Sequence, residues 1–243
     1  MDNIDENIYD IERLTHEEVR RRIGEVPAVI FPLGGCEPFG AVGEVGAESA
    51  CALEIARELS RVSGILIAPL LPFSCSGPFI SFAGAAAVKP HTFVNMLCDI
   101  LHSYVFQGIN RIFLVNAAPF NWGPADEVMR RMTLKYPGLK MAFFDINTVL
   151  NGDKASDLDR DDGLILSLLS YIRLKPFEGI DAKPLDKEEY KVWKRRGRDP
   201  QKFQAICPDG LMLPPDSGSI TPAGGKELFE RIVSAVHEKI KAA

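Results

Sequence analysis

Two rhythms of apolar and polar residues alternate along the chain, and each predicts a different kind of element. Continuous apolar runs, typical of strands buried on both faces of a parallel sheet, cover residues 26–33, 64–71, 111–117 and 139–146. Between and around these runs, apolar residues recur at the spacing of amphipathic helices. The expected helices cover residues 16–24, 47–59, 93–107, 124–136, 161–173 and 222–241.

Local signals mark where two of these helices begin and end. Thr15 and Glu18 have the spacing of a capping box, which predicts a helix start directly after Thr15. Gly108 follows the helix that carries Phe93 and Leu97, and a glycine in that place is typical of a helix end. The helix boundaries therefore follow from the sequence as well as the helices themselves.

Strands that alternate with helices through short loops predict an α/β fold. We expect a three-layer α/β/α sandwich with a mostly parallel central sheet, because such connections cover both sheet faces with helices. Ligands bind these sheets at the carboxyl ends of the strands. The loops at those ends are residues 34–48, 72–90 and 116–123.

Residues 1–243 are expected to form a single domain, with one long excursion. Residues 176–216 break the alternation and are rich in proline. They also carry a basic cluster around Trp193, and two interpretations of it stay open: a solvated surface segment, or a contact for a phosphate or an acidic partner. The cluster consists of Lys191, Lys194, Arg195, Arg196 and Arg198.

Composition excludes several classes of protein. Hydrophobic residues make up 46% of the 243 residues, which is enough for a large core, and the net charge of -5 argues against a nucleic-acid binder. No run of about 18 apolar residues predicts a membrane span, and the acidic start at residues 1–12 lacks the pattern of a signal peptide. The five cysteines are scattered, which is typical of reduced thiols in a cytoplasmic protein.

The predicted loops carry an ordered set of short motifs. Residues 32–37 read Pro-Leu-Gly-Gly-Cys-Glu, residues 82–84 read Phe-Ala-Gly, and residues 114–121 read Leu-Val-Asn-Ala-Ala-Pro-Phe-Asn. This order resembles the creatininase family, with its Pro-x-Gly-Ser-x-Glu-Gln-His-Gly opening, its Phe-Pro-Gly-Thr segment and its Asn-Gly-His-x-x-Asn loop. The resemblance covers residues 12–170, with a weaker echo over residues 216–240.

The resemblance implies a fold, a reaction and a metal centre. Members of the family hydrolyse amides with two divalent metals, zinc or manganese, which polarise the carbonyl and generate hydroxide. The metals are held by a Glu and a His of the first loop, an Asp about ten residues later, and the His of the Asn-Gly-His loop. The family also forms oligomers, often hexamers, which implies a homo-oligomer or a subunit of a larger assembly here.

This sequence departs from that ligand set at most positions. Glu37 stands at the first metal-binding Glu, and Glu48 stands at the bridging Asp, one methylene longer. Phe39 and Ala118 stand where the family has metal-binding histidines. The only weak candidates for metal ligands are thus Glu37, Glu48 and, near a late Glu of the family, Asp162.

Two further positions differ in the same direction. Phe79 stands at a histidine of the family's middle loop, and Phe120 stands where the creatinine-cleaving branch has an acid. The rings of Phe39, Phe79 and Phe120 either stack on a flat ligand or fill the space that metals would occupy. The four histidines lie outside these loops, at His16, His91, His102 and His237.

The remaining polar candidates also allow two interpretations each. Glu37 and Glu48 bind a ligand, or they solvate the rim and favour the helix start near Ala47. Asn116 and Asn121 keep the family's flanking amides, and they bind a ligand or fix the loop.

Cysteine chemistry is a separate possibility. Cys36 and Cys75 lie on the same loops, and Cys36 could act as a nucleophile with Glu37 and Lys89, or both cysteines simply pack.

Three functions follow from these alternatives. The first is a non-catalytic binding or assembly subunit, because three histidine positions have become apolar. The second is an amidohydrolase with altered acid and base chemistry that uses Glu37, Glu48 or Cys36 on a small cyclic or linear amide. The third is an amidohydrolase with weakly bound zinc or manganese. Each function is compatible with a small-molecule ligand in the cleft at the strand ends.

Overall fold

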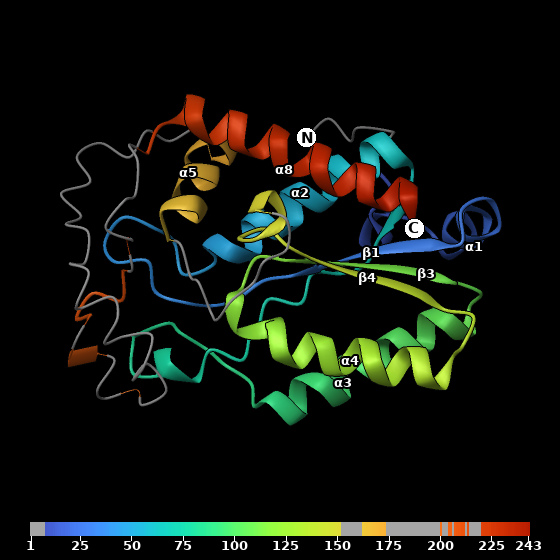
Figure 1. The fold of residues 1–243 in the computed structure, drawn as a ribbon, viewed down its shortest axis with the longest axis horizontal. Helices are drawn as coiled ribbons and strands as arrows, with labels where there is room; N and C mark the ends of the chain where they lie inside the picture. The colour runs from blue at the N-terminus through green and yellow to red at the C-terminus, as the bar shows by residue number, and fades with distance from the viewer. Residues whose placement is uncertain are drawn as a thin grey trace.

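The computed structural model describes residues 8–151, 162–173 and 220–243, and between 174 and 219 only residues 200, 204–205, 207–211 and 213. Its centre is a four-stranded parallel sheet in the order β2-β1-β3-β4 (Figure 1). The six residues of β1 pair in register with β3, from Ala28 with Arg111 to Leu33 with Asn116. The strands are β1 (Ala28–Leu33), β2 (Leu66–Ile67), β3 (Arg111–Asn116) and β4 (Lys140–Asp145).

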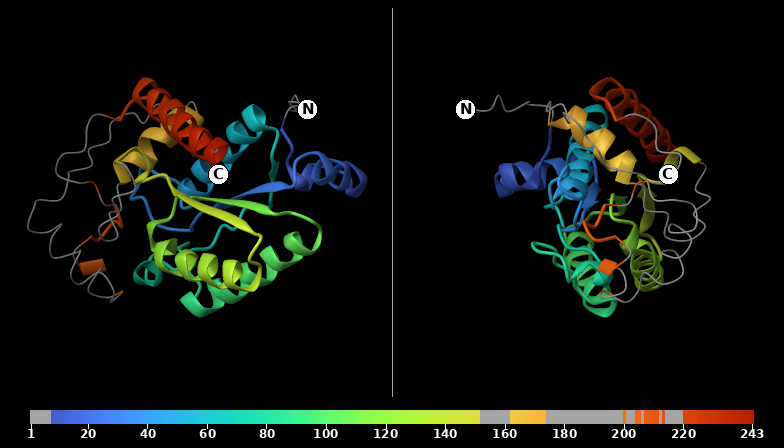
Figure 2. Two further views of the ribbon diagram at one scale, coloured as in Figure 1. Left: turned by 45° about the vertical axis from the view of Figure 1, so that its right-hand side comes forward. Right: turned by 90° about the vertical axis from the view of Figure 1, so that its left-hand side faces the viewer.

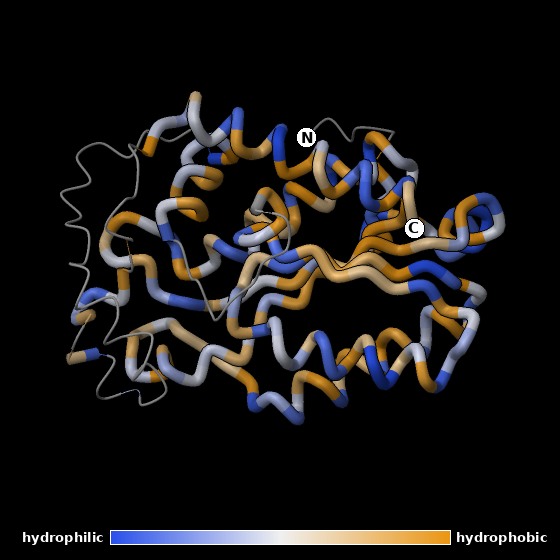
Figure 3. The backbone as a smooth tube through the Cα atoms, in the orientation of Figure 1, coloured by the Kyte–Doolittle hydropathy of each residue, from blue (hydrophilic) through white to orange (hydrophobic). Residues whose placement is uncertain are grey.

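Helices cover both faces of this sheet, as the three-layer prediction requires (Figure 2). One face is covered by α2 (Ala47–Ser63), α5 (Asp162–Ile172) and α8 (Pro222–Ala242). The other is covered by α3 (Pro90–Phe106) and α4 (Trp122–Lys135), with α1 (His16–Glu25) beside them. Apolar strands run between these layers (Figure 3). Four short 3-10 helices complete the described elements: η1 (Ile11–Arg13), η2 (Gly77–Phe79), η3 (Pro119–Asn121) and η4 (Val149–Asn151).

The predicted elements are confirmed with small shifts at their ends. Both hydrogen bonds of the capping box between Thr15 and Glu18 form at the start of α1. The predicted helix face on α2 is fully buried, from Ala52 to Leu59. Gly108 follows α3 with a φ of 101°, in the left-handed region that favours glycine.

One strand is much shorter than its apolar run predicted. Residues 64–71 were expected to form a full strand, but only Leu66–Ile67 pairs as one. The regular alternation ends after Ala68, because Leu71 rather than Leu70 is the next residue to donate to β1; the missing N–H of Pro69 would face the opposite side, where Ile67 N–H donates to Tyr9 O. The chain still runs along β1, because Ala68 N–H donates to Ile30 O and Leu71 N–H donates to Pro32 O. This segment therefore still leads into the loop at the strand ends.

The excursion at 176–216 lies mostly outside the described residues, and the basic cluster at 191–198 lies wholly outside them. Its role and the single-domain prediction stay predictions. Within the described ranges, no helix is long and apolar enough to cross a membrane.

Candidate functional site

Buried polar side chains gather at the carboxyl ends of β1, β3 and β4. Glu37, Asn116 and Asn121 have no exposed surface, and Asp145 is 5% exposed. They come from three separate loops, which the parallel sheet brings to one edge (Figure 1). The predicted location of the site is the place where the fold concentrates its polar interior.

Glu37 accepts a hydrogen bond from a hydroxyl group on the loop after β2. Ser74 Oγ donates to Glu37 Oε1 at 2.8 Å, and Ser74 Oγ lies 2.7 Å from Ser76 Oγ. A hydroxyl has one proton, so when Ser74 donates to Glu37 the proton between the serines belongs to Ser76. Both serines are buried. The result is a hydroxyl chain that runs from Ser76 through Ser74 to Glu37.

Gly35 allows the two predicted carboxylates to approach one another. A Cβ on Gly35 would lie 2.3 Å from Glu48 Oε2, 3.1 Å from Glu37 Oε1 and 3.1 Å from Ser74 Oγ. Any larger residue would displace one of these groups. The glycine thus gathers Glu37, Glu48 and Ser74 around one point, so the fold brings together two of the three predicted metal candidates.

Glu48 also lies where a helix start favours an acid. It is in the first turn of α2, whose N-cap residue Gly46 supplies no side-chain hydrogen bond. Asp162 has the same position in α5 and is fully buried. Both acids therefore lie where the helix-start interpretation expects an acid.

The three phenylalanines do not line one common space. Phe39 belongs to the core beneath α2, α5 and α8, where its Cβ and the Leu166 side chain crowd against Gly43. Phe79 packs in a separate cluster with Phe120, edge to face at 5.6 Å between ring centroids. Phe39 and Phe79 are buried and Phe120 is half-buried. Phe39 therefore packs in a different cluster from Phe79 and Phe120, and the two interpretations of these rings stay open.

The two asparagines lie in a hydrogen-bond chain with Asp145. Asn116 Nδ2 donates to Asp145 Oδ2 at 2.9 Å, and Asn121 Nδ2 donates to Asn116 Oδ1 at 3.1 Å. Sequence reasoning missed Asp145. Its signal was a polar residue at the end of a buried strand, directly across from Asn116 in the register of β3 and β4.

The cysteines have the properties of packing residues. Burial, with a smaller contribution from the neighbouring charge of Glu37, raises the pKa of the Cys36 thiol. Burial raises the pKa of Cys75 to about 12. A thiol that resists ionisation is a poor nucleophile. Lys89, the third predicted partner, is exposed at the N-cap of α3.

The donor set at this edge does not fit the metal pair that the family resemblance implies. Its carboxylates have no imidazole beside them, since Phe39 and Ala118 are buried apolar residues and the four histidines lie on α1, α3 and α8. Within the residues the structure describes, no group of three or more His, Cys, Asp or Glu side chains could hold an ion. We therefore derive no step through a metal.

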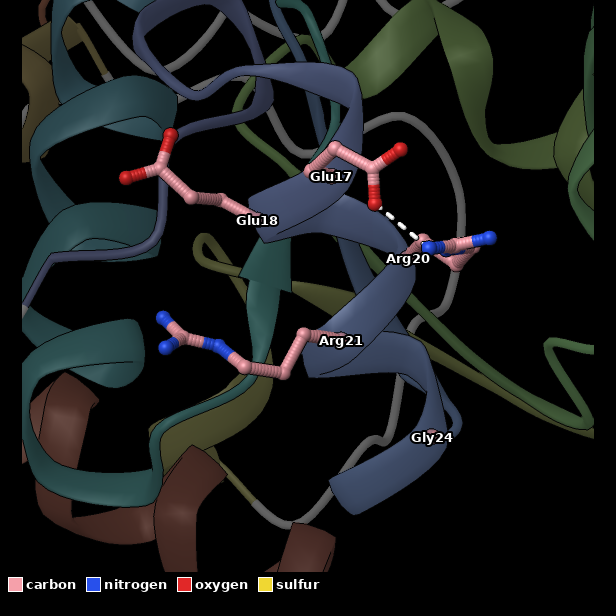
Figure 4. A pocket seen from close by; sticks show the side chains of 5 residues that line it. All are labelled: Glu17, Glu18, Arg20, Arg21 and Gly24. Carbon is pink, nitrogen blue, oxygen red and sulfur yellow. Dashed lines mark hydrogen bonds and ion pairs between the residues drawn. The ribbon is translucent and has the colours of Figure 1, made fainter.

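A shallow hollow on α1 is a separate feature (Figure 4). It is lined by Glu17, Glu18, Arg20, Arg21 and Gly24. All five belong to one exposed helix that precedes β1, so the hollow lies away from the carboxyl ends of the strands.

The architecture is similar to solved creatininase structures. A mutant creatininase complexed with creatine aligns at a TM-score of 0.73 and 18% identity, over 97% of this chain and 98% of that chain. A structure described as creatininase Mn aligns at 0.69 and 16%, over 97% and 98%. A Bacteroides fragilis NCTC 9343 protein assigned as a creatinine amidohydrolase aligns at 0.70 and 16%, over 96% and 94%. At these identities the likeness establishes the fold.

Sequence comparison supplies the family. No curated protein matches the chain. The creatininase family profile, described as creatinine amidohydrolase, matches residues 12–240, which is nearly the whole chain. By its sequence and its fold, the chain belongs to the creatininase family.

Proposed function

We propose that this protein has lost the dinuclear-metal amidohydrolase reaction and acts as a non-catalytic binding or assembly subunit. The observation that carries the proposal is the burial of Phe39 at 1% exposure and of Ala118 at 0%. The resemblance places metal-binding histidines at both positions. Each of these positions is buried and carries an apolar side chain that offers no ligand atom.

The remaining acids support the same proposal. Glu37 already accepts a hydrogen bond from Ser74, and Glu48 lies at the start of α2. Two carboxylates without imidazole leave a divalent ion mostly hydrated, which makes binding weak. A zinc or manganese ion would therefore occupy this edge only at high concentration.

An assembly role draws support from the surface around this edge. The adjoining loops and the first residue of α4 expose large apolar side chains: Phe73 at 41%, Ile80 at 59% and Trp122 at 47%. Aromatic residues are enriched where proteins associate. A homo-oligomer or a larger assembly would cover them, and a small molecule that enters the edge would pass them.

Metal content and activity test this proposal together. We expect the purified protein to contain far less than one zinc or manganese per chain by elemental analysis, and to show no hydrolysis of creatinine with either metal added. A chelator should leave its melting temperature unchanged, because only a ligand of the folded state adds stability. One metal per chain that disappears in Glu37→Gln would contradict the proposal.

The hydroxyl chain favours a second candidate, an amidohydrolase with altered acid and base chemistry. Ser76 could attack the amide carbonyl carbon while its proton passes through Ser74 to Glu37, and the leaving amine would take that proton as the C–N bond breaks. Water would then hydrolyse the acyl-serine ester, which releases the acid and restores Ser76. Activity on a chromogenic amide that is lost in both Ser76→Ala and Glu37→Gln, without added metal, would establish it. Equal background rates in all three proteins would exclude it.

A further inference from the structure

One chain of hydrogen bonds at this edge runs in a single direction. The backbone N–H of Cys75 donates to Asn121 Oδ1 at 3.1 Å. Asn121 Nδ2 donates to Asn116 Oδ1 at 3.1 Å, and Asn116 Nδ2 donates to Asp145 Oδ2 at 2.9 Å. The chain thus begins on the loop after β2 and ends on the last residue of β4.

Side branches fix both amides in this orientation. Asn121 Nδ2 also donates to Gly34 O at 3.3 Å, and Asn116 Nδ2 also donates to Ala118 O at 2.8 Å. If either amide turned over, an amide oxygen would face these carbonyl oxygens. The two amides must therefore keep their orientation together or lose it together.

Asp145 is the member that cannot reverse. Its other oxygen, Oδ1, accepts from the backbone N–H and from Nδ2 of Asn147, both at 2.9 Å. An amide offers a donor at one end and an acceptor at the other, but an ionised carboxylate only accepts. Every described hydrogen bond to the Asp145 carboxylate comes from an N–H donor. The charge of Asp145 therefore determines the direction of the hydrogen-bond chain.

We propose that Asp145 is a positioning residue that sets the orientation of Asn116 and Asn121 and thereby holds Cys75 at the site. Cys75 lies between Ser74 and Ser76, the two hydroxyls that reach Glu37. Asp145 therefore controls the placement of the Glu37 partner without touching it. This inference concerns the hold on the loop and stands whether or not the protein hydrolyses anything.

Protonation of Asp145 at low pH should break the hydrogen bond between Cys75 and Asn121. Oδ1 of Asp145 accepts from a backbone N–H, which cannot reverse, so a proton would sit on Oδ2 and face the Asn116 donor. Asn116 would then have to turn, followed by Asn121, and Asn121 would present an N–H to Cys75. Burial already raises the pKa of Asp145, while hydrogen bonds from Asn147 and Asn116 oppose that rise.

Charged groups of the elements packed against β4 lie elsewhere. On β3 the charged residue is Arg111, at the opposite end of the strand. On α4, Glu127 pairs with Arg130 and Arg131 on the outer surface, where Asp126 is exposed and Lys135 lies in the last turn. On β4, Lys140 binds the C-terminal Ala243. None of these charges contributes to the shift at Asp145.

Hydrogen exchange at the Cys75 amide tests the proposal in the intact protein. We expect its protection factor, corrected for intrinsic exchange, to fall at least about tenfold as pH falls through the titration of Asp145, because a buried donor loses its acceptor. Asp145→Asn should show the low value at every pH. Asp126→Asn, at an exposed position of α4, is the matched control and should keep the wild-type profile.

A second readout covers the case in which Asp145→Asn fails to fold. In the wild-type protein, the side-chain amide signals of Asn116 and Asn121 should shift together in nitrogen-15 spectra, with the midpoint of the Cys75 protection. A merely structural asparagine pair would show no shared midpoint. Protection of the Cys75 amide that does not depend on pH would overturn the inference. Side-chain amide signals of Asn116 and Asn121 that titrate separately would also overturn it.

Discussion

Buried polar side chains are arranged differently in the two halves of the strand-end edge, the region at the carboxyl ends of β1, β3 and β4. Around Gly35, the half after β1 gathers Glu37 and Glu48, with the Ser74 hydroxyl at one of them. In the half after β3 and β4, every polar side-chain atom of Asn116 and Asn121 is hydrogen-bonded, and the chain ends on Asp145. The first half gathers two carboxyl groups around one point, and the second fixes the loops. A ligand would bind at the first half, and the second half would hold the first half in shape.

Histidines in place of Phe39 and Ala118 should break this division with the largest effect. Each imidazole would replace a buried apolar side chain, which puts a polar group into the apolar core at Phe39 and overpacks the site at Ala118. We expect Phe39→His with Ala118→His to lower the free energy of unfolding by about 4 kcal/mol or more, measured by urea denaturation.

Zinc should not restore the loss in this variant. Glu48 would still be one methylene longer than the family's Asp, and metal sites tolerate ligand distances only within about 0.2 Å. Adding Glu48→Asp should improve zinc affinity more than either histidine alone, as measured by isothermal titration. Tight zinc binding with amide hydrolysis in the double variant would show that the metal frame is still intact.

Gly34 joins the two halves, and an alanine there should have the next largest effect. Its carbonyl accepts from Asn121, and a Cβ would lie 2.5 Å from Ser49 Cα and 2.4 Å from Ser49 Oγ. Because backbone must move, we expect Gly34→Ala to cost about 3 kcal/mol of stability.

Gly77→Ala is the matched control on a neighbouring loop. A Cβ on Gly77 would meet nothing within 4 Å, so its unfolding free energy should stay near that of the parent. Equal effects of the two alanines would mean that a Cβ at Gly34 does not force the backbone of α2 to move.

The fold was largely predictable from the sequence, but the site was predictable only in part. Apolar runs and helical spacing predicted the three layers, because burial follows the pattern of apolar residues. Only the run at residues 64–71 predicted a much longer strand than the one that forms. Motif position predicted that Glu37 and Asn116 lie at the carboxyl ends of the strands, and both lie there as buried polar residues. Asp145 was missed because its role depends on the register of β4 with β3, and the separation of Phe39 from Phe79 depends on packing between segments that are far apart in the sequence.

Removing one polar group from each half should measure their difference. Asn116→Ala leaves Asp145, Asn121 and the Ala118 carbonyl each short of a partner, and we expect a loss of about 3 kcal/mol. Ser74→Ala removes one donor from Glu37, and we expect a loss of about 1.5 kcal/mol. Chemical denaturation of both variants gives the comparison. A larger loss in Ser74→Ala would make the Glu37 half the structural one.

The smallest effect separates the global from the local consequence of the Asp145 charge. Its folded-state pKa is raised above the ordinary value of 3.8, so the folded state binds the proton more tightly than the unfolded state. The contribution of Asp145 to stability is then present at low pH and is lost as pH rises through the raised pKa. The unfolding free energy of the wild type minus that of Asp145→Asn should therefore fall with rising pH, from about pH 4 upward. Over the same range, protection of the Cys75 amide should rise. Glu127→Gln serves as a control of opposite sign, since hydrogen bonds from Arg130 and Arg131 lower the pKa of Glu127 from 4.5 to about 2, and its contribution is lost as pH falls through that window. If global stability and Cys75 protection changed in the same direction around Asp145, the hydrogen-bond chain would be no more than part of the general packing of the core.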